Sequence, residues 1–225
     1  MAEVVPIKVF GSSSIGVYIV ANNSTAFVPP DVPEKIDDEV RSALGDVVVR
    51  ATVAKSPLLG IFMVMNDNGV LVPGIALEEE IGVLRGLGLN VGVLHTKYTA
   101  IANLIVANNK AAIVSPILEP ENRRIVADVL GVEVFVDSLT SSPLVGSLAV
   151  ANSRGVLVAP DATDSDLKKL EKYLGVRADV GTVNRGRSFL RGGMVANDRG
   201  ALVGWETTGA EIMRIMSTLF KGEKP

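Results

Sequence analysis

The sequence predicts an α/β protein, a five-bladed α/β propeller with pseudo-fivefold symmetry that the amino-terminal strand closes. Three observations predict this fold. A hairpin pattern recurs five times, a Leu-Gly pair recurs at the same period, and a strand missing at the carboxyl end is present at the amino end. Five units of about 45 residues account for all 225 residues, so we expect a single domain over residues 1–225.

The hairpin pattern is an apolar run, a turn centred on asparagine, and a second apolar run that closes on Pro or Gly. The first asparagines of the turns follow one another at intervals of 44, 42, 44 and 45 residues, and they are Asn22, Asn66, Asn108, Asn152 and Asn197. An asparagine side chain can close an Asx turn, and a glycine three residues later can adopt a positive φ. The turns at 22–25 and 108–111 lack that glycine. We therefore expect those two turns to differ slightly in type.

The Leu-Gly pairs each follow a segment of helical character. Their glycines are Gly45, Gly88, Gly131 and Gly175, and glycine is favoured just past the end of a helix because it adopts the left-handed conformation without strain. In residues 161–175, Leu167, Leu170 and Leu174 share one helical face. The same reasoning predicts amphipathic helices at 33–44, 77–87, 119–130 and 208–220. A short β-rich segment follows each of the first four helices.

The two ends of the chain predict how the repeat closes. The fifth helix is followed only by KGEKP, whereas VVPIKVF at 4–10 resembles the β-rich segments that follow the other helices. If this amino-terminal segment supplies the missing strand, the first and last units join and no open edge remains between blades. The alternative is an open stack of units, which usually carries distinct capping repeats; no such repeat is evident.

Composition excludes several classes of protein. The chain has 22 basic and 25 acidic residues, a net charge of -3, so its surface as a whole is not a cationic nucleic-acid binder. The absence of cysteine removes disulfides, thiolate metal sites and thiol nucleophiles. No apolar run reaches the roughly 18–20 residues that span a bilayer, and the amino terminus lacks a signal-peptide pattern. We expect a cytoplasmic protein without a membrane partner.

Three motifs that can carry chemistry have structural explanations. His95 follows a strand, with no second His or Cys to complete a metal set. Ser165 and Lys168 match S-x-x-K, but they lie in the first turn of a helix, where Ser is a capping residue. Gly86 and Gly88 end a helix, whereas the glycines of a nucleotide fingerprint begin one. We expect no catalytic residue, no metal and no cofactor.

Two features are candidates for binding. Five residues before the turn asparagines, at the start of each inner strand, the units carry Val17, Ile61, Asn103, Ser147 and Gly192. The amide of Asn103 can face a partner or bond to a neighbouring loop. The segment 177–199 contains five arginines and two aspartates. Arginines in its Gly-bordered loop suit phosphate or carboxylate, although the same loop can simply be solvated.

Several stretches resemble one known family. The segments NRRIVADVLGVEVF (122–135), VLVAP (156–160), GTVNRG (181–186) and GMVANDRGALVG (193–204) are similar to the translation initiation factor 6 family, and to its archaeal form in particular. The resemblance runs along essentially the whole chain, in register with all five units. It implies the pentein fold, a five-bladed α/β propeller, in agreement with the fold predicted from the spacing.

The resemblance also implies a function and a site. Members of this family bind the large ribosomal subunit on its intersubunit face, beside the sarcin-ricin loop, with most contacts to ribosomal proteins and a minor contact to rRNA. They thereby block association with the small subunit. Asn103 matches a position of ribosomal contact, and Asn184, Arg185 and Gly186 match the family's GTVNRG loop as candidates for the interface. A turn-forming role fits Asn184 and Gly186 equally well. We expect a monomer, a ribosome anti-association factor linked to ribosome biogenesis.

An enzyme is the alternative. Other pentein-fold proteins act on guanidino compounds with a cysteine nucleophile, and this sequence has no cysteine. A further alternative is a small-molecule site in the central channel, whose lining the sequence does not reveal.

Overall fold

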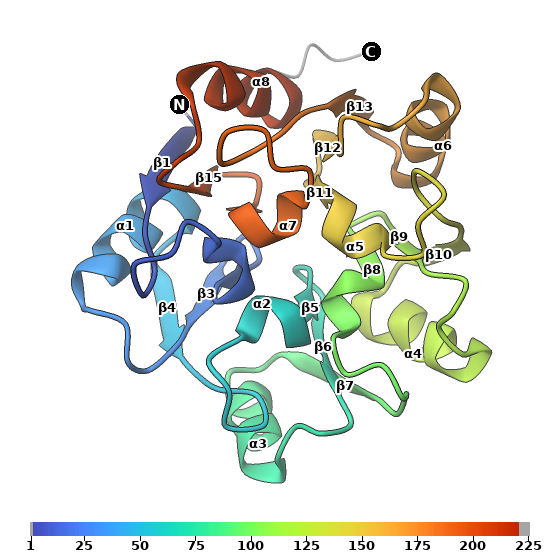
Figure 1. Cartoon of the computed structure of the whole chain (residues 1–225). Coiled ribbons are helices and arrows are strands. Elements are labelled where there is room, and N and C mark those ends of the chain that lie inside the picture. Colours follow the sequence, from blue (N-terminus) through green and yellow to red (C-terminus); the bar gives the residue numbers. More distant parts are fainter. Residues whose placement is uncertain (1, 221–225) are drawn as a thin grey trace.

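A computed structural model describes residues 2–220, which form five three-stranded sheets around a common centre (Figure 1). We number the units one to five by their asparagine turns. Unit one contains η1 (Ile15–Val17), β2 (Val20–Ala21), β3 (Thr25–Val28), α1 (Lys35–Leu44) and β4 (Val47–Arg50). Unit two contains α2 (Leu59–Phe62), β5 (Val64–Met65), β6 (Gly69–Pro73), α3 (Glu78–Gly86) and β7 (Asn90–Leu94). Unit three contains η2 (Ile101–Asn103), β8 (Ile105–Ala107), β9 (Ala111–Val114), α4 (Pro120–Leu130) and β10 (Glu133–Val136). Unit four contains α5 (Val145–Leu148), β11 (Ala149–Ala151), β12 (Gly155–Val158), α6 (Asp164–Leu174) and β13 (Arg177–Val180). Unit five contains α7 (Leu190–Gly193), β14 (Met194–Ala196), β15 (Gly200–Gly204) and α8 (Gly209–Leu219), and β1 (Glu3–Ile7) completes its sheet.

Every sheet has the same topology. The middle strand pairs antiparallel with the strand before it and parallel with a third strand, which in four sheets is the strand that follows the long helix, as in β2-β3-β4. A parallel pair needs a crossover connection, and the long helix supplies it. The five predicted helices are confirmed, with ends within three residues of the predicted bounds. The long helices lie at the rim and the short helical turns surround the centre (Figure 1).

The amino-terminal strand joins the two ends of the chain. β1 pairs in parallel with β15, from Glu3 opposite Gly200 to Ile7 opposite Gly204. It thus occupies the place that β4, β7, β10 and β13 occupy in the other sheets. The predicted pairing of the amino-terminal segment with the fifth unit is confirmed.

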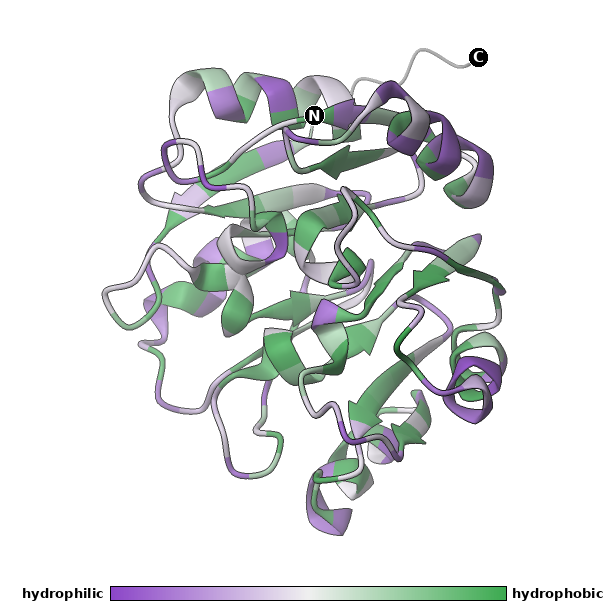
Figure 2. Ribbon diagram, turned by 45° about the vertical axis from the view of Figure 1, so that its right-hand side comes forward, coloured by the Kyte–Doolittle hydropathy of each residue, from purple (hydrophilic) through white to green (hydrophobic). Residues whose placement is uncertain are grey.

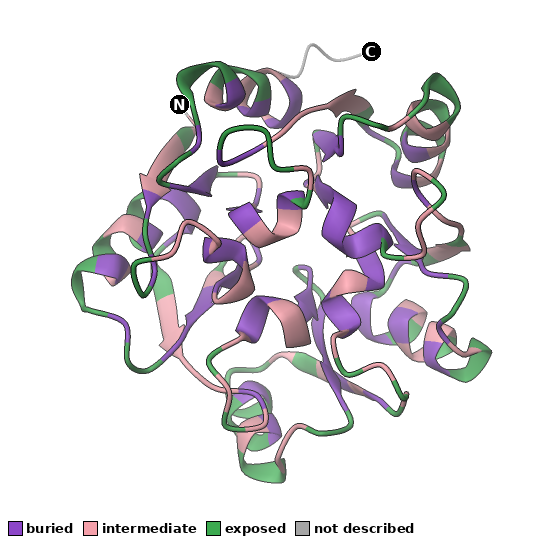
Figure 3. Ribbon diagram, in the orientation of Figure 1, coloured by how far each residue is buried: buried purple, intermediate pink, exposed green. Residues whose placement is uncertain are grey.

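The hydrophobic core is divided among the seams between neighbouring units. Five buried clusters are present, and each combines side chains of two adjacent units. One of them joins Ile7 and Leu202 of the fifth sheet to Val40 and Leu44 of α1, and so buries the seam between the last unit and the first. The two inner strands of each sheet are hydrophobic and mostly buried, while the rim helices turn a polar, exposed side outward (Figures 2 and 3). No unit has a complete core of its own.

The topology gives the ring two different faces. The parallel strands of each sheet end at the same edge, where the loops run on to the helical turns. We call this end the loop face; its connecting loops are residues 8–14, 51–58, 95–100, 137–144 and 181–189. The five asparagine turns lie at the opposite end, the asparagine face, because each joins the far ends of two antiparallel strands.

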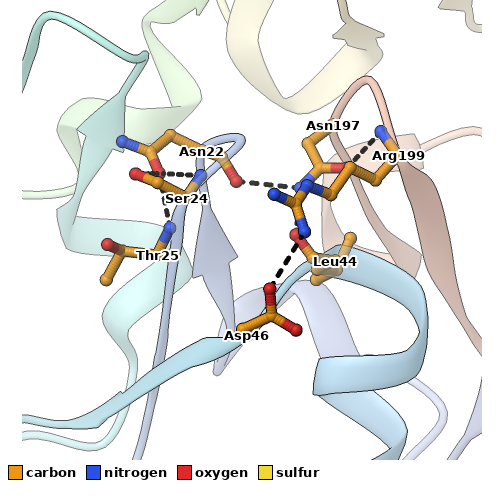
Figure 4. Close-up of polar contacts among 7 residues, drawn as sticks. All are labelled: Asn22, Ser24, Thr25, Leu44, Asp46, Asn197 and Arg199. Atoms are coloured by element: carbon orange, nitrogen blue, oxygen red, sulfur yellow. Dashed lines mark hydrogen bonds and ion pairs between the residues drawn. The ribbon is translucent and has the colours of Figure 1, made fainter.

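The asparagine turns are linked into a closed circuit of hydrogen bonds. Each asparagine Nδ2 donates to the backbone carbonyl of the equivalent asparagine in the next unit, at distances from 2.8 to 3.2 Å. The last bond of the circuit runs from Asn197 to Asn22, and Figure 4 shows it. All five asparagines are buried. The circuit therefore couples every unit to its neighbour, including the fifth to the first.

The same amide groups also bind the ends of the rim helices. In four of the five units, Nδ2 donates a second bond to the last carbonyl of the next unit's helix. Asn197, for example, lies 2.6 Å from the carbonyl oxygen of Leu44 at the end of α1 (Figure 4). Carbonyls at a helix end have no partner within the helix. The circuit thus fixes helices as well as turns.

Two sequence expectations about the hairpins are wrong. All five turns have the same geometry, because each asparagine Oδ1 accepts from the backbone nitrogens two and three residues on, in 22–25 and 108–111 as elsewhere. The turn glycines do not have positive φ. A Cβ at Gly155 would lie 2.1 Å from the carbonyl oxygen of Thr218. Close approach of the neighbouring helix, and not turn type, requires glycine there.

The start of each hairpin also differs from the prediction. The first apolar run is not one long strand. It begins as a helical turn of three or four residues and continues as a strand of only two or three. Val17, Ile61, Asn103, Ser147 and Gly192 consequently lie in these helical turns and not on strands.

We expect Asn66→Asp to destabilise the protein by about 3–5 kcal/mol, because it places a buried carboxylate against the carbonyls of Asn108 and Leu130. Urea unfolding at pH 7 measures the loss. Asn68→Asp is the matched control: Asn68 donates to the same Leu130 carbonyl but is exposed, so its loss should stay below about 1 kcal/mol. Equal losses in both variants would contradict a structural role for the circuit.

Candidate functional site

The candidate site occupies the loop face, where the sequence-predicted residues lie. Asn103 is the last residue of η2, one of the helical turns around the centre, and is half-buried. None of the hydrogen bonds among residues 2–220 involves its side chain. The alternative in which the amide bonds to a neighbouring loop therefore has no support, and the amide remains available to a partner.

Asn184 has a different position. It is buried, and its Nδ2 donates to the carbonyl of Ser13 at 2.8 Å. Its Oδ1 accepts from the hydroxyl of Thr207, whose oxygen in turn accepts from the Asn184 backbone nitrogen. Asn184 therefore joins the loop of unit five to the first loop of unit one and to the segment before α8.

Arg185 and Gly186 are exposed at the tip of the same turn. Asn184, Arg185 and Gly186 all have positive φ, at 49°, 62° and 93°. In the equivalent turns at 9–12, 53–56 and 139–142, an antiparallel β-bridge pairs two residues that are three positions apart. In unit five the bridge pairs Val183 with Arg187, which are four positions apart. The unit-five turn is one residue longer than these three, and it projects the Arg185 side chain outward.

A carboxylate holds this strained turn in place. Glu211, in the first turn of α8, accepts from the backbone nitrogens of Gly186 at 2.9 Å and Arg185 at 3.3 Å. It also accepts from Thr182 and Thr208. Burial by itself raises the pKa of Glu211, but these hydrogen bonds outweigh it and lower the pKa below its usual value. The ionised carboxylate is thus the form that the fold stabilises.

Unit two repeats this arrangement. Glu80 accepts from the backbone nitrogens of Ala54 and Lys55 and from the hydroxyl of Thr52. Burial again opposes the effect, and the hydrogen bonds lower the pKa of Glu80. Neither Glu80 nor Glu211 could be identified as a functional residue from the sequence. The spacing of Thr208 and Glu211 is that of a capping box and marks the helix start, but it does not reveal that the same carboxylate holds a loop.

The loops of the loop face are basic although the chain is acidic. Their exposed cations are Lys8, Lys55, Lys97, Arg185 and Arg187. Asp137 is the one carboxylate in the five loops, and it is paired with Lys169 at 3.0 Å. Acidic residues instead gather in the segments that begin the rim helices. The inner part of the loop face therefore carries positive charge inside an acidic rim.

Exposed aromatic side chains accompany these cations. Phe10, Phe189 and Trp205 are 48%, 59% and 61% exposed. Lys8 Nζ lies 5.8 Å from the centre of the Trp205 ring, and Phe10 packs edge-to-face on Tyr18. Exposed aromatic residues with arginine are typical of protein-binding surfaces.

The three motifs with structural explanations behave as predicted. His95 is exposed just after β7. The S-x-x-K motif begins α6, which Thr163 and Asp166 cap. Gly88 follows the end of α3 with φ 78°. Among residues 2–220, no group of three or more His, Cys, Asp or Glu residues is arranged to hold a metal ion. None of the helices in this range is long and apolar enough to cross a membrane.

Together these features define a class of protein: five tandem units linked end to end, with a candidate site that is an exposed basic and aromatic surface. The model of the eIF-6 family matches residues 4–218. The chain belongs to this family, whose members are initiation factors of protein biosynthesis.

Individual relatives agree with this assignment. A Pyrobaculum arsenaticum protein named Translation initiation factor 6 is 67% identical over 219 residues, which cover 97% of this chain and 100% of that protein. The Pyrobaculum aerophilum protein of the same name is 65% identical over the same length. One from Saccharolobus islandicus is 40% identical over 216 residues, or 95% of this chain and 97% of that protein.

We expect Glu211→Gln to cost about 1–3 kcal/mol at pH 7, because an amide cannot accept all the bonds that the carboxylate accepts. A carboxylate with a lowered pKa contributes stability above its unfolded pKa, and this contribution is lost as the pH falls through the folded pKa. The difference in the free energy of unfolding between the wild type and Glu211→Gln should therefore become smaller below about pH 4.5. Urea midpoints across pH 3–7 measure it. Glu206→Gln, exposed in the segment before α8, is the control, and a similar loss there would contradict the role of Glu211.

Proposed function

We propose that the protein binds the large ribosomal subunit on its intersubunit face and sterically prevents association with the small subunit. The observation that carries the proposal is membership of an initiation-factor family together with an exposed, basic loop face. The partners are ribosomal proteins near the sarcin-ricin loop, with a minor rRNA contact. The protein acts as a single pentein domain over residues 1–225, a five-bladed α/β propeller closed by its amino-terminal strand.

The loop face suits such a partner. Its cations can meet phosphate or acidic side chains, while the helical turns at its centre, with the accessible amide of Asn103, suit a protein surface. A rim of acidic residues around this centre is compatible with basic ribosomal proteins and limits the contact with rRNA. This separation of basic loops from an acidic rim lets a chain with a net charge of -3 approach a ribosome in one orientation.

The mechanism is occlusion and requires no chemical step. A stiff body bound to the intersubunit face occupies space that the small subunit needs, so affinity and residence time set the effect. Rigidity matters because a deformable ring could yield to the incoming subunit. The closed asparagine circuit and the five seam clusters supply that rigidity.

The four candidate residues divide into two roles in this proposal. Asn103 and Arg185 contact the ribosome, because their side chains are accessible on the loop face. Asn184 and Gly186 position Arg185: the first is buried in a hydrogen-bonded joint, and the second supplies the positive φ that ends the turn.

Other parts of the proposal follow from the family and the site. The protein acts in the cytoplasm as a monomer, contributes to ribosome biogenesis, and is not an enzyme. An enzyme acting on guanidino compounds is the alternative function, and a hydrolysis assay on arginine derivatives tests it. The lack of cysteine argues against it.

The direct test is sucrose-gradient sedimentation with purified archaeal ribosomal subunits. We expect the protein to travel with large subunits, to stay behind when mixed with small ones, and to shift a mixture of both toward free subunits. Sedimentation with the small subunit, or no shift of the mixture, would overturn the proposal.

Two variants test the residues. Asn103→Ser and Arg185→Glu should each weaken binding to the large subunit about tenfold, because each removes an accessible interface group. Their melting temperatures should stay close to that of the wild type. Arg154→Glu, an equal charge reversal in an exposed turn of the asparagine face, should bind normally. If binding weakens only in variants whose melting temperature also falls, these residues have a structural role instead.

A further inference from the structure

Arg191 interrupts the repeat at the centre of the ring. It lies six residues before Asn197, and the equivalent positions in the other units hold Gly16, Gly60, Ala102 and Gly146. Small residues are required there: a Cβ at Gly16 would lie 1.9 Å from the carbonyl oxygen of Arg191, and one at Gly60 as close to that of Gly16. Unit five alone places a long cationic side chain at this position.

The Arg191 side chain reaches across the ring. Its Nε donates to the carbonyl of Gly60 at 3.2 Å, and one terminal nitrogen donates to that of Met63 at 2.9 Å. Both acceptors belong to α2 and its end, in unit two, which is not a neighbour of unit five. Carbonyls at a helix end favour a cation. These bonds use two of the five N–H groups of the guanidinium.

The surroundings supply no balancing charge. A cavity of about 60 Å³ lies along the axis, and Arg191 contributes the one polar side chain among the described residues that line it. The others are apolar, such as Ala21, Met65, Ala107 and Met194. None of the ion pairs within residues 2–220 includes Arg191. Burial lowers the pKa of Arg191 to about 10, so the group is still a cation at neutral pH.

Two carboxylates on the axis are engaged elsewhere. Asp67 and Asp198 line the hollow at the asparagine face, which adjoins the axial cavity and shares lining residues with it. Asp67 accepts from the backbone nitrogen and the amide of Asn23 and from the amide of Asn109. Asp198 accepts from Ser153 and from Asn23. The two carboxylates are thus held in a hydrogen-bonded rim around that mouth, away from the helical turns where Arg191 lies.

We propose that the axial cavity is an anion site, in which the guanidinium of Arg191 binds a single halide-sized inorganic anion. Arg191 is a half-buried cation that faces apolar side chains and has no carboxylate partner, and such a cation attracts an anion. The free N–H groups of Arg191 are the donors for that charge. The cavity, about 60 Å³, has room for one small anion with a few waters.

If the site binds an anion, the free energy of unfolding of the ring should increase with the anion concentration. A halide that binds the folded chain and not the unfolded one stabilises it by mass action, to a degree that levels off as the site fills. Arg191 joins unit five to unit two, so the anion acts on a contact that spans the centre.

Bromide is the probe for the test. Crystals of the full chain grown or soaked in sodium bromide are measured at the bromine absorption edge. We expect an anomalous peak in the axial cavity within hydrogen-bond distance of the Arg191 guanidinium. A well-ordered cavity without such a peak, or with water alone against the guanidinium, would overturn the proposal.

A solution measurement isolates Arg191. Urea midpoints are compared in sodium bromide and in sodium gluconate at equal ionic strength, since gluconate is too large for the cavity. The wild-type midpoint should rise with bromide and level off. Arg191→Met should abolish the rise, and Arg177→Met, which removes an exposed arginine on β13, should retain it. The same bromide dependence in Arg191→Met as in the wild type would refute the site. If that variant does not fold, the anomalous peak in the wild type decides alone.

Discussion

The hydrogen bonds of five asparagine side chains fix the geometry on which the rest of this structure depends. The oxygen of each amide closes its own turn, and the nitrogen binds the next unit. In four units the nitrogen also binds the end of the next helix. A buried amide with every bond made restricts the angle between units more than apolar packing does, because hydrogen bonds are directional. Repeating one restricted angle five times brings the last unit to the first. Closure is therefore a consequence of local chemistry.

Closure in turn decides where the core lies. Because the apolar clusters occupy the seams, a unit taken alone leaves half of two clusters exposed, and an open chain leaves the fifth seam unburied. Pairing β1 with β15 buries that seam and removes a free sheet edge at the same time. The loops are held in fixed positions as a result, because the ring that anchors them cannot open at one seam without breaking the asparagine circuit. A strained turn such as Asn184–Gly186 persists only on such support, here through Ser13, Thr207 and Glu211.

Features that repeat could be predicted from the sequence, and features that depend on three-dimensional neighbours could not. The asparagine and Leu-Gly spacings predict the units and the helices, and the strand missing after the fifth helix predicts the partner of β1. The helical turns escaped prediction because an apolar run of a few residues has no periodicity that separates strand from helix. The turn glycines were misinterpreted because their reason lies in the adjacent helix, as Gly155 against Thr218 shows. Glu211 and Glu80 were missed for the same reason: each acts on a loop that is 25 or more residues away in the chain.

Departure from the repeat is the signal that remains for function. A residue that every unit carries, such as the turn asparagine, serves the architecture, since any unit lacking it would break the circuit. A residue that one unit carries alone has no such obligation, and its presence needs another cause. Asn103 replaces an aliphatic or small residue, the 183–187 turn has one more residue than the bridged turns of units one, two and four, and Arg191 replaces glycine or alanine. The first two lie on the accessible loop face, so contact with a partner explains them. Arg191 is half-buried and lines the axial cavity, where an internal ligand or an internal bond explains it.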